Sequence, residues 1–126
     1  MQLKGSCGMI TGAGRGIGKA IALRLAKEGA NLSLLARTER ELIEVVNEVK
    51  EFGVSAYYTV GDVSKSEDVD RFYSDTMARF PMVDFLINNA GIAYYGELTR
   101  MPLEKVIGMM KVNFFRSILL DHEGPS

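Results

Sequence analysis

Short apolar runs alternate with stretches of helical spacing along almost all of this 126-residue chain. The apolar runs predict strands over residues 6–11, 31–36, 54–60 and 83–88. The helical spacing of apolar residues predicts helices over residues 16–29, 38–53, 64–80 and from Pro102 to Phe114. Each connection is long enough for a crossover between parallel strands. The alternation therefore predicts an α/β fold, in which helices cover both faces of a doubly wound parallel sheet.

Charge and cysteine content narrow the classes of partner. The chain carries 15 Lys and Arg residues against 16 Asp and Glu residues, a net charge of -1. This balance gives no electrostatic reason to expect nucleic acid or an anionic membrane as a partner. Cys7 is the one cysteine, so no internal disulfide can form and no Cys/His cluster suggests a metal. Without a secretion signal at residues 1–5 or an apolar run of membrane-spanning length, we expect a cytoplasmic protein.

The segment Thr11–Gly18 reads TGAGRGIG and joins the first predicted strand to the first predicted helix. It does not match G-x-G-x-x-G, because Ile17 or Lys19 stands at the last glycine position. Glycines still let the backbone approach a pyrophosphate, and a helix N-terminus offers free N–H groups and a positive dipole end. An ordinary strand–helix turn is the alternative, but five small residues in eight positions exceed what a turn needs. The candidate cofactor-binding residues here are Gly12, Gly14, Arg15, Gly16, Ile17 and Gly18.

The end of the second predicted strand bears on the choice of dinucleotide. Folds that prefer NAD usually place an acid there to bind the ribose hydroxyls. Here the strand ends with Ala36, which is followed by Arg37, and Arg15 is expected nearby in the glycine loop. Two guanidinium groups can hold the 2′-phosphate of NADP through paired hydrogen bonds. Two solvated surface arginines are the alternative, but their joint position favours NADP over NAD.

A second motif, NNAG at Asn88–Gly91, follows the fourth predicted strand. With TGAGRGIG, in this order and on these strand ends, it resembles the signatures of the short-chain dehydrogenase/reductase family. The resemblance covers residues 3–120, and the overall likeness is to 3-oxoacyl-acyl-carrier-protein reductases. It implies a Rossmann-type sheet with strand order 3-2-1-4, from which strands five to seven of the family are absent. Residues 1–120 would form an NADP(H)-binding half-domain, and residues 121–126 an irregular polar tail.

The resemblance also implies roles for single residues. Asp62 would accept a hydrogen bond from the adenine amino group, and Val63 would contribute its backbone, although a turn Asp before a helix cap is the alternative. Ser64 and Glu67 form a capping-box pattern just after it. Asn113, inside the last predicted helix, would be a catalytic residue that supports a proton relay, or else a polar surface residue. The loop expected to line the cofactor consists of Asn89, Ala90 and Gly91.

The family's hydride transfer, between nicotinamide and a ketone or secondary alcohol, needs a Ser and a Tyr with a Lys four residues later. That Lys brings the Tyr pKa down toward neutrality. No Tyr of this chain has such a Lys, since the five places hold Gly61, Asp62, Met77, Leu98 and Thr99. Two interpretations stay open: an NADP-dependent oxidoreductase whose 126 residues alone are inactive, or a non-catalytic nucleotide-binding fragment or truncated product. We also expect self-association or a homo-oligomer, because strand four would lack its neighbour.

Overall fold

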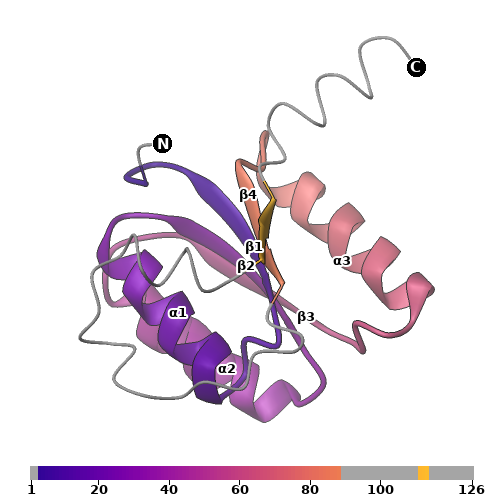
Figure 1. Cartoon of the computed structure of the whole chain (residues 1–126). Coiled ribbons are helices and arrows are strands. Elements are labelled where there is room, and N and C mark those ends of the chain that lie inside the picture. Colours follow the sequence, from indigo (N-terminus) through magenta and orange to yellow (C-terminus); the bar gives the residue numbers. More distant parts are fainter. Residues whose placement is uncertain (1–2, 89–110, 114–126) are drawn as a thin grey trace, which may run out of the picture.

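The computed structural model describes residues 3–88 and 111–113 and contains a five-stranded sheet in the order β3-β2-β1-β4-β5 (Figure 1). The first four strands are parallel, as the sequence predicts, in the order 3-2-1-4. A helix connects each of these strands to the next, and β1 lies between β2 and β4 in the sheet. The strands are β1 Cys7–Thr11, β2 Asn31–Ala36, β3 Ala56–Val60, β4 Phe85–Asn88 and β5 Lys111–Asn113.

Helices cover both faces of the sheet, and each face has its own core. Helices α1 (Gly16–Lys27) and α2 (Glu39–Lys50) pack on one face, and α3 (Ser66–Arg79) lies on the other (Figure 1). The larger apolar cluster joins α1 and α2 to the strands, and the smaller one places Phe72 of α3 against Met9 and Leu35. The buried positions of α2 are those that the helical spacing predicts, namely Leu42, Val45, Val46 and Val49.

The structure contradicts the predicted helix around Asn113. Residues Lys111–Asn113 form β5, which pairs antiparallel with β4 so that Asn113 lies opposite Leu86. The rest of that predicted helix lies outside the described residues. A buried parallel strand with no outer neighbour would leave a row of N–H and C=O groups unpaired, and three residues of extended chain pair with part of it. This long-range pairing outweighs the local helical spacing.

The predicted capping box is also wrong. Helix α3 begins at Ser66, with Lys65 at its N-cap and no side-chain cap. The backbone N–H and hydroxyl of Ser64 instead donate to Oδ1 of Asp62, over 2.9 and 2.7 Å. Both are charge-assisted hydrogen bonds to a carboxylate, so Ser64 donates to Asp62 and does not accept a helix N–H as a cap would. The segment before α3 is therefore a turn organised by Asp62.

Candidate functional site

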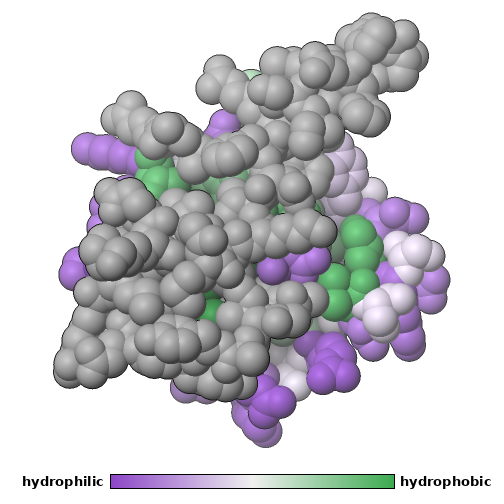
Figure 2. Space-filling model, in the orientation of Figure 1, coloured by the Kyte–Doolittle hydropathy of each residue, from purple (hydrophilic) through white to green (hydrophobic). Residues whose placement is uncertain are grey.

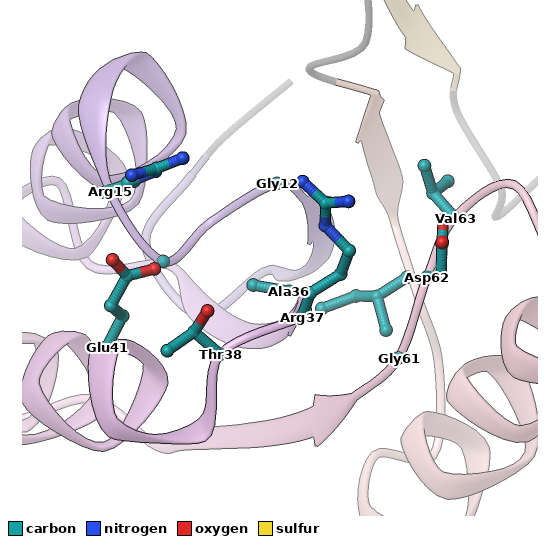
Figure 3. Close-up of a pocket in the computed structure, with 11 residues that line it drawn as sticks. Gly12, Arg15, Ala36, Arg37, Thr38, Glu41, Gly61, Asp62 and Val63 are labelled. Atoms are coloured by element: carbon teal, nitrogen blue, oxygen red, sulfur yellow. The ribbon is translucent and has the colours of Figure 1, made fainter.

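A pocket of about 260 Å³ lies where β1, β2 and β3 end, in the loops that lead from these strands into the helices. Because the three strands are parallel neighbours, their carboxyl ends bring three loops to one edge of the sheet, where ligands of open α/β sheets bind. Figure 3 shows these loops around the pocket. Its lining comprises Gly12, Gly14, Arg15, Leu35, Ala36, Arg37, Thr38, Glu41, Gly61, Asp62 and Val63.

The glycine loop forms one wall of this pocket and leads directly into α1. Gly12 and Gly16 have φ angles of 64° and 60°, which side chains with a Cβ rarely adopt. Arg15 is the N-cap of α1, and no hydrogen bond from its side chain caps the helix. The first N–H groups of α1 are therefore available at the loop, where the helix dipole favours an anion.

Four charged side chains line the pocket, and their formal charges cancel. Arg15 and Arg37 are cationic, and both are exposed. Figure 3 shows Arg37 extending toward Gly12, with Arg15 on the other side of the loop. Glu41 enters from α2, and its Oε1 would lie 3.0 Å from a Cβ placed on Gly14. With Asp62 as the second acid, the electrostatic preference of the pocket for a ligand depends on where each charge lies rather than on net charge.

Asp62 is held as an anion at the end of β3. Its pKa is lowered by the hydrogen bonds from the Ser64 backbone and hydroxyl, and further by the charges of Arg37 and Lys65. Oδ1 of Asp62 accepts both bonds from Ser64, and Oδ2 has no hydrogen-bond partner among the residues that the structure describes. Val63, 43% exposed, adjoins Asp62 on the rim. The arrangement offers an ionised acceptor to a donor group in the pocket.

Six of the predicted cofactor-binding residues meet in this pocket, and three others do not line it. Ile17 is only 6% exposed and belongs to the core under α1, on the apolar face that its helical spacing with Ile21 and Leu25 indicates. The predicted loop 89–91 lies outside the described residues. Those that line the pocket are Gly12, Gly14, Arg15, Arg37, Asp62 and Val63, and those that do not are Gly16, Ile17 and Gly18.

Sequence reasoning missed several lining residues, of which Glu41 matters most chemically. Leu35, Thr38 and Gly61 contribute mainly their position at the ends of β2 and β3. Glu41 could have been found, because it lies in the first turn of the helix that follows Arg37. Side chains of a first helical turn point back toward the helix N-terminus, which here faces the pocket.

The sheet also joins the ends of β1 and β4 beside the pocket. The Thr11 hydroxyl donates to Oδ1 of Asn88 over 3.1 Å, one residue beyond the pairing of Ile10 with Ile87. Between these strands the chain order reverses, since β2 lies on one side of β1 and β4 on the other. This switch point places Asn88, the first residue of NNAG, next to the start of the glycine loop.

Other kinds of site find no support in the described part of the chain. Within residues 3–88 and 111–113, no three His, Cys, Asp or Glu residues are grouped so as to hold a metal ion. No helix in these same ranges has the length and apolarity needed to cross a membrane. The pocket at the ends of β1–β3 is a candidate ligand site on its own geometry.

Comparison with known proteins agrees with this geometry. The family model described as short chain dehydrogenase matches residues 7–123, nearly the whole chain. The chain belongs to the short-chain dehydrogenase family. It is 41% identical over 118 residues to 11-beta-hydroxysteroid dehydrogenase A of Sesamum indicum, covering 90% of this chain and 33% of that protein. A 3-oxoacyl-acyl-carrier-protein reductase of Staphylococcus epidermidis is 39% identical over 94 residues, covering 74% of this chain and 38% of the reductase.

Solved structures of short-chain dehydrogenases superpose on the chain with either dinucleotide bound. L-sorbose reductase from Gluconobacter frateurii, in complex with NADPH and L-sorbose, is 37% identical with a TM-score of 0.68, covering 83% of this chain and 41% of the reductase. NAD+-bound xylitol dehydrogenase is 39% identical, also with a TM-score of 0.68, covering 73% of this chain and 35% of that enzyme. The chain thus spans less than half the length of the relatives that it matches. A Rossmann-type fold and a nicotinamide dinucleotide as cofactor are common to this family.

Proposed function

We propose that this chain is the nucleotide-binding part of an NADP-dependent oxidoreductase that transfers hydride between nicotinamide and a ketone or secondary alcohol. The observation that carries the choice of cofactor is the presence of Arg15 and Arg37 in one pocket beside Ala36, where an NAD-binding fold usually has an acid. The 39% sequence identity to a 3-oxoacyl-acyl-carrier-protein reductase supports a 3-oxoacyl substrate. A non-catalytic nucleotide-binding protein remains the alternative, because the 126 residues contain no Tyr-x-x-x-Lys.

The residues present fit an NADP molecule that lies across the strand ends. In this proposal the glycine loop and the N-terminus of α1 hold the pyrophosphate, and the two arginines hold the 2′-phosphate. Asp62 accepts a hydrogen bond from the adenine amino group, and the neighbouring Val63 contributes its backbone. The nicotinamide, when bound, supplies the hydride chemistry. The loop Asn89, Ala90 and Gly91 would line the same cofactor.

We propose that Asn113 is a supporting catalytic residue. It lies on strand β5 rather than on a helix. As part of β5 it lies opposite Leu86 of β4, two residues before Asn88. Support for the role comes from the resemblance in KVNFF and from this nearness to the strand that ends in NNAG. Truncation to alanine in a complete enzyme of this sequence should lower kcat more than it raises KM.

Arg37→Ala is expected to weaken NADP binding about tenfold while changing NAD binding little. The arginine contributes a charge-assisted hydrogen bond to a phosphate that only NADP carries, and its exposure keeps the effect at the low end. Calorimetric titration of the chain with both dinucleotides measures the two affinities. Equal NAD and NADP affinities that Arg37→Ala leaves unchanged would show that the chain does not select NADP.

Replacing the acid Glu41 in the same pocket should change NADP affinity in the opposite direction to Arg37→Ala. Glu41→Gln removes a half-buried negative charge near the proposed phosphate site and should strengthen NADP binding about threefold. Glu44→Gln makes the same charge change on an exposed face of α2 that does not line the pocket, so both affinities should stay unchanged. An identical effect of the two variants would mean that only the overall charge matters.

We propose that the chain also self-associates. The β4 edge contributes less to self-association than the sequence predicts, because β5 pairs with Leu86–Asn88 and covers that part of it. Apolar side chains remain exposed near both ends of α3, Val69 by 36% and Met82 by 38%. Figure 2 shows a green area among hydrophilic residues on the side of α3. Light scattering should show a mass that rises with concentration. A monomeric mass at every concentration, without binding of an apolar dye, would refute the proposal.

The cytoplasm is the setting we propose for the protein. Cys7 is a free, half-buried thiol, and burial raises its pKa, so it is kept mainly in the thiol form near neutral pH. A lone inert thiol is compatible with a reducing compartment.

A further inference from the structure

Two side chains of α3 reach back and hold the turn that forms one wall of the pocket. Oδ2 of Asp68 accepts the backbone N–H of Asp62 over 2.8 Å. Oδ1 of the same carboxylate accepts Nη1 of Arg71 over 3.1 Å. Nη2 of Arg71 in turn donates to the carbonyl oxygen of Val60. The pair therefore grips the backbone on both sides of Gly61.

Gly61 packs closely against this pair, so that a side chain there would force its neighbours to shift. A Cβ at Gly61 would lie 3.0 Å from Cβ of Asp68 and 3.1 Å from Nη2 of Arg71. The Asp68 side chain is 18% exposed, whereas that of Arg71 is 47% exposed. The pKa of Asp68 is lowered, mainly by the backbone N–H of Asp62 and then by Arg71, so the carboxylate stays ionised near neutral pH.

This turn carries Asp62, the acid that lines the pocket just after β3. Its backbone N–H is fixed by Asp68, and its Oδ1 is fixed by Ser64 over 2.7 and 2.9 Å. Bonds to both ends of Asp62 restrict its rotation, so Oδ2 is held in one direction at the pocket lining. A preorganised acceptor discriminates between ligands better than one that must first be ordered.

We infer that Asp68 and Arg71 are positioning residues of the nucleotide pocket, which fix Asp62 so that it selects a purine with an amino group at position 6. This inference rests on the proposed binding of the dinucleotide. A 6-amino group donates to the Asp62 carboxylate. A 6-oxo purine presents an acceptor there instead, and two acceptors facing each other are unfavourable. Neither residue touches the ligand in this arrangement.

The test compares NADPH with its hypoxanthine analogue, reduced nicotinamide hypoxanthine dinucleotide phosphate, by calorimetric titration of the full chain. The unmodified chain should bind the adenine form about tenfold more tightly, as a charge-assisted hydrogen bond implies. Asp68→Ala should weaken adenine binding about fivefold and hypoxanthine binding much less, so that the ratio of affinities falls toward about two. Asp70→Ala makes the same charge change at an exposed position of α3 and should leave the ratio unchanged.

Arg71→Gln keeps the experiment decisive if Asp68→Ala does not fold, because the Arg71 side chain is half exposed. It should lower the ratio in the same direction by a smaller factor, with a circular dichroism spectrum like that of the unmodified chain. An equal loss of both dinucleotides, or an unchanged ratio in folded variants, would overturn the positioning role. Absence of binding of either dinucleotide to the unmodified chain would instead refute the proposed function.

Discussion

Gly8→Ala is expected to lower the free energy of unfolding by about 3 kcal/mol or more, the upper part of the range for overpacking a core. Gly8 of β1 lies opposite Phe85 of β4, and a Cβ at Gly8 would overlap the Phe85 ring, with Cε2, Cζ and Cδ2 all within 2.8 Å. The ring is 1% exposed and belongs to the larger core cluster, so it cannot move into solvent. Thermal unfolding followed by circular dichroism should show a Tm lower by about 10 °C or more.

Two variants distinguish a steric clash from a general effect of replacing glycine. Gly14→Ala places its Cβ 3.0 Å from Oε1 of Glu41 and 3.2 and 3.3 Å from the Cβ atoms of Glu41 and Ala36, so small shifts suffice and its melting temperature should fall much less. Phe85→Leu in the Gly8→Ala background should recover part of the lost stability, because a smaller side chain leaves room for the methyl group. A Gly8→Ala chain with the same melting temperature as the unmodified chain would show that β1 and β4 do not pack as described.

The 126-residue chain by itself is expected to catalyse no carbonyl reduction above background. A positioned general acid and base contributes about 10²–10⁴-fold in rate, and the sequence contains no Tyr with a Lys four residues later to serve as that group. Absorbance of NADPH at its nicotinamide band, followed with several ketones and a 3-oxoacyl thioester, measures the rate. A full-length short-chain dehydrogenase in the same assay provides the positive control.

The outcome separates the two interpretations of this sequence. Clear turnover by the chain would show that other residues supply the acid and base. Background activity together with tight NADP binding would agree with a nucleotide-binding part that needs further residues for chemistry. Whether the natural reading frame continues past Ser126 into a Ser and a Tyr-x-x-x-Lys is the observation that then favours the enzyme over a non-catalytic binding protein.

The sequence by itself determined the element order from β1 to β4, the parallel arrangement of these four strands and the position of the glycine loop. These features follow from local periodicity, since apolar runs and helical spacing record which faces are buried. Two motifs at two strand ends, Thr11–Gly18 and Asn88–Gly91, were also sufficient to indicate the family. Arg15 and Arg37 could be expected to meet because the ends of neighbouring parallel strands share one edge of the sheet.

Only the tertiary structure decided which further side chains reach that edge and how its loops are held. The place of Glu41 in the first turn of α2 can be read from the sequence, but its approach to Gly14 depends on the packing of α2 beside α1. Asp68 and Arg71 hold the turn around Asp62 across one helical turn, a set of contacts that appears only once α3 is docked. Asn113 became part of a strand because the open edge of β4 supplied hydrogen-bond partners distant in the sequence. Long-range pairing of this kind outweighs local preference, since unpaired backbone groups in a sheet cost more than a few residues of helix contribute.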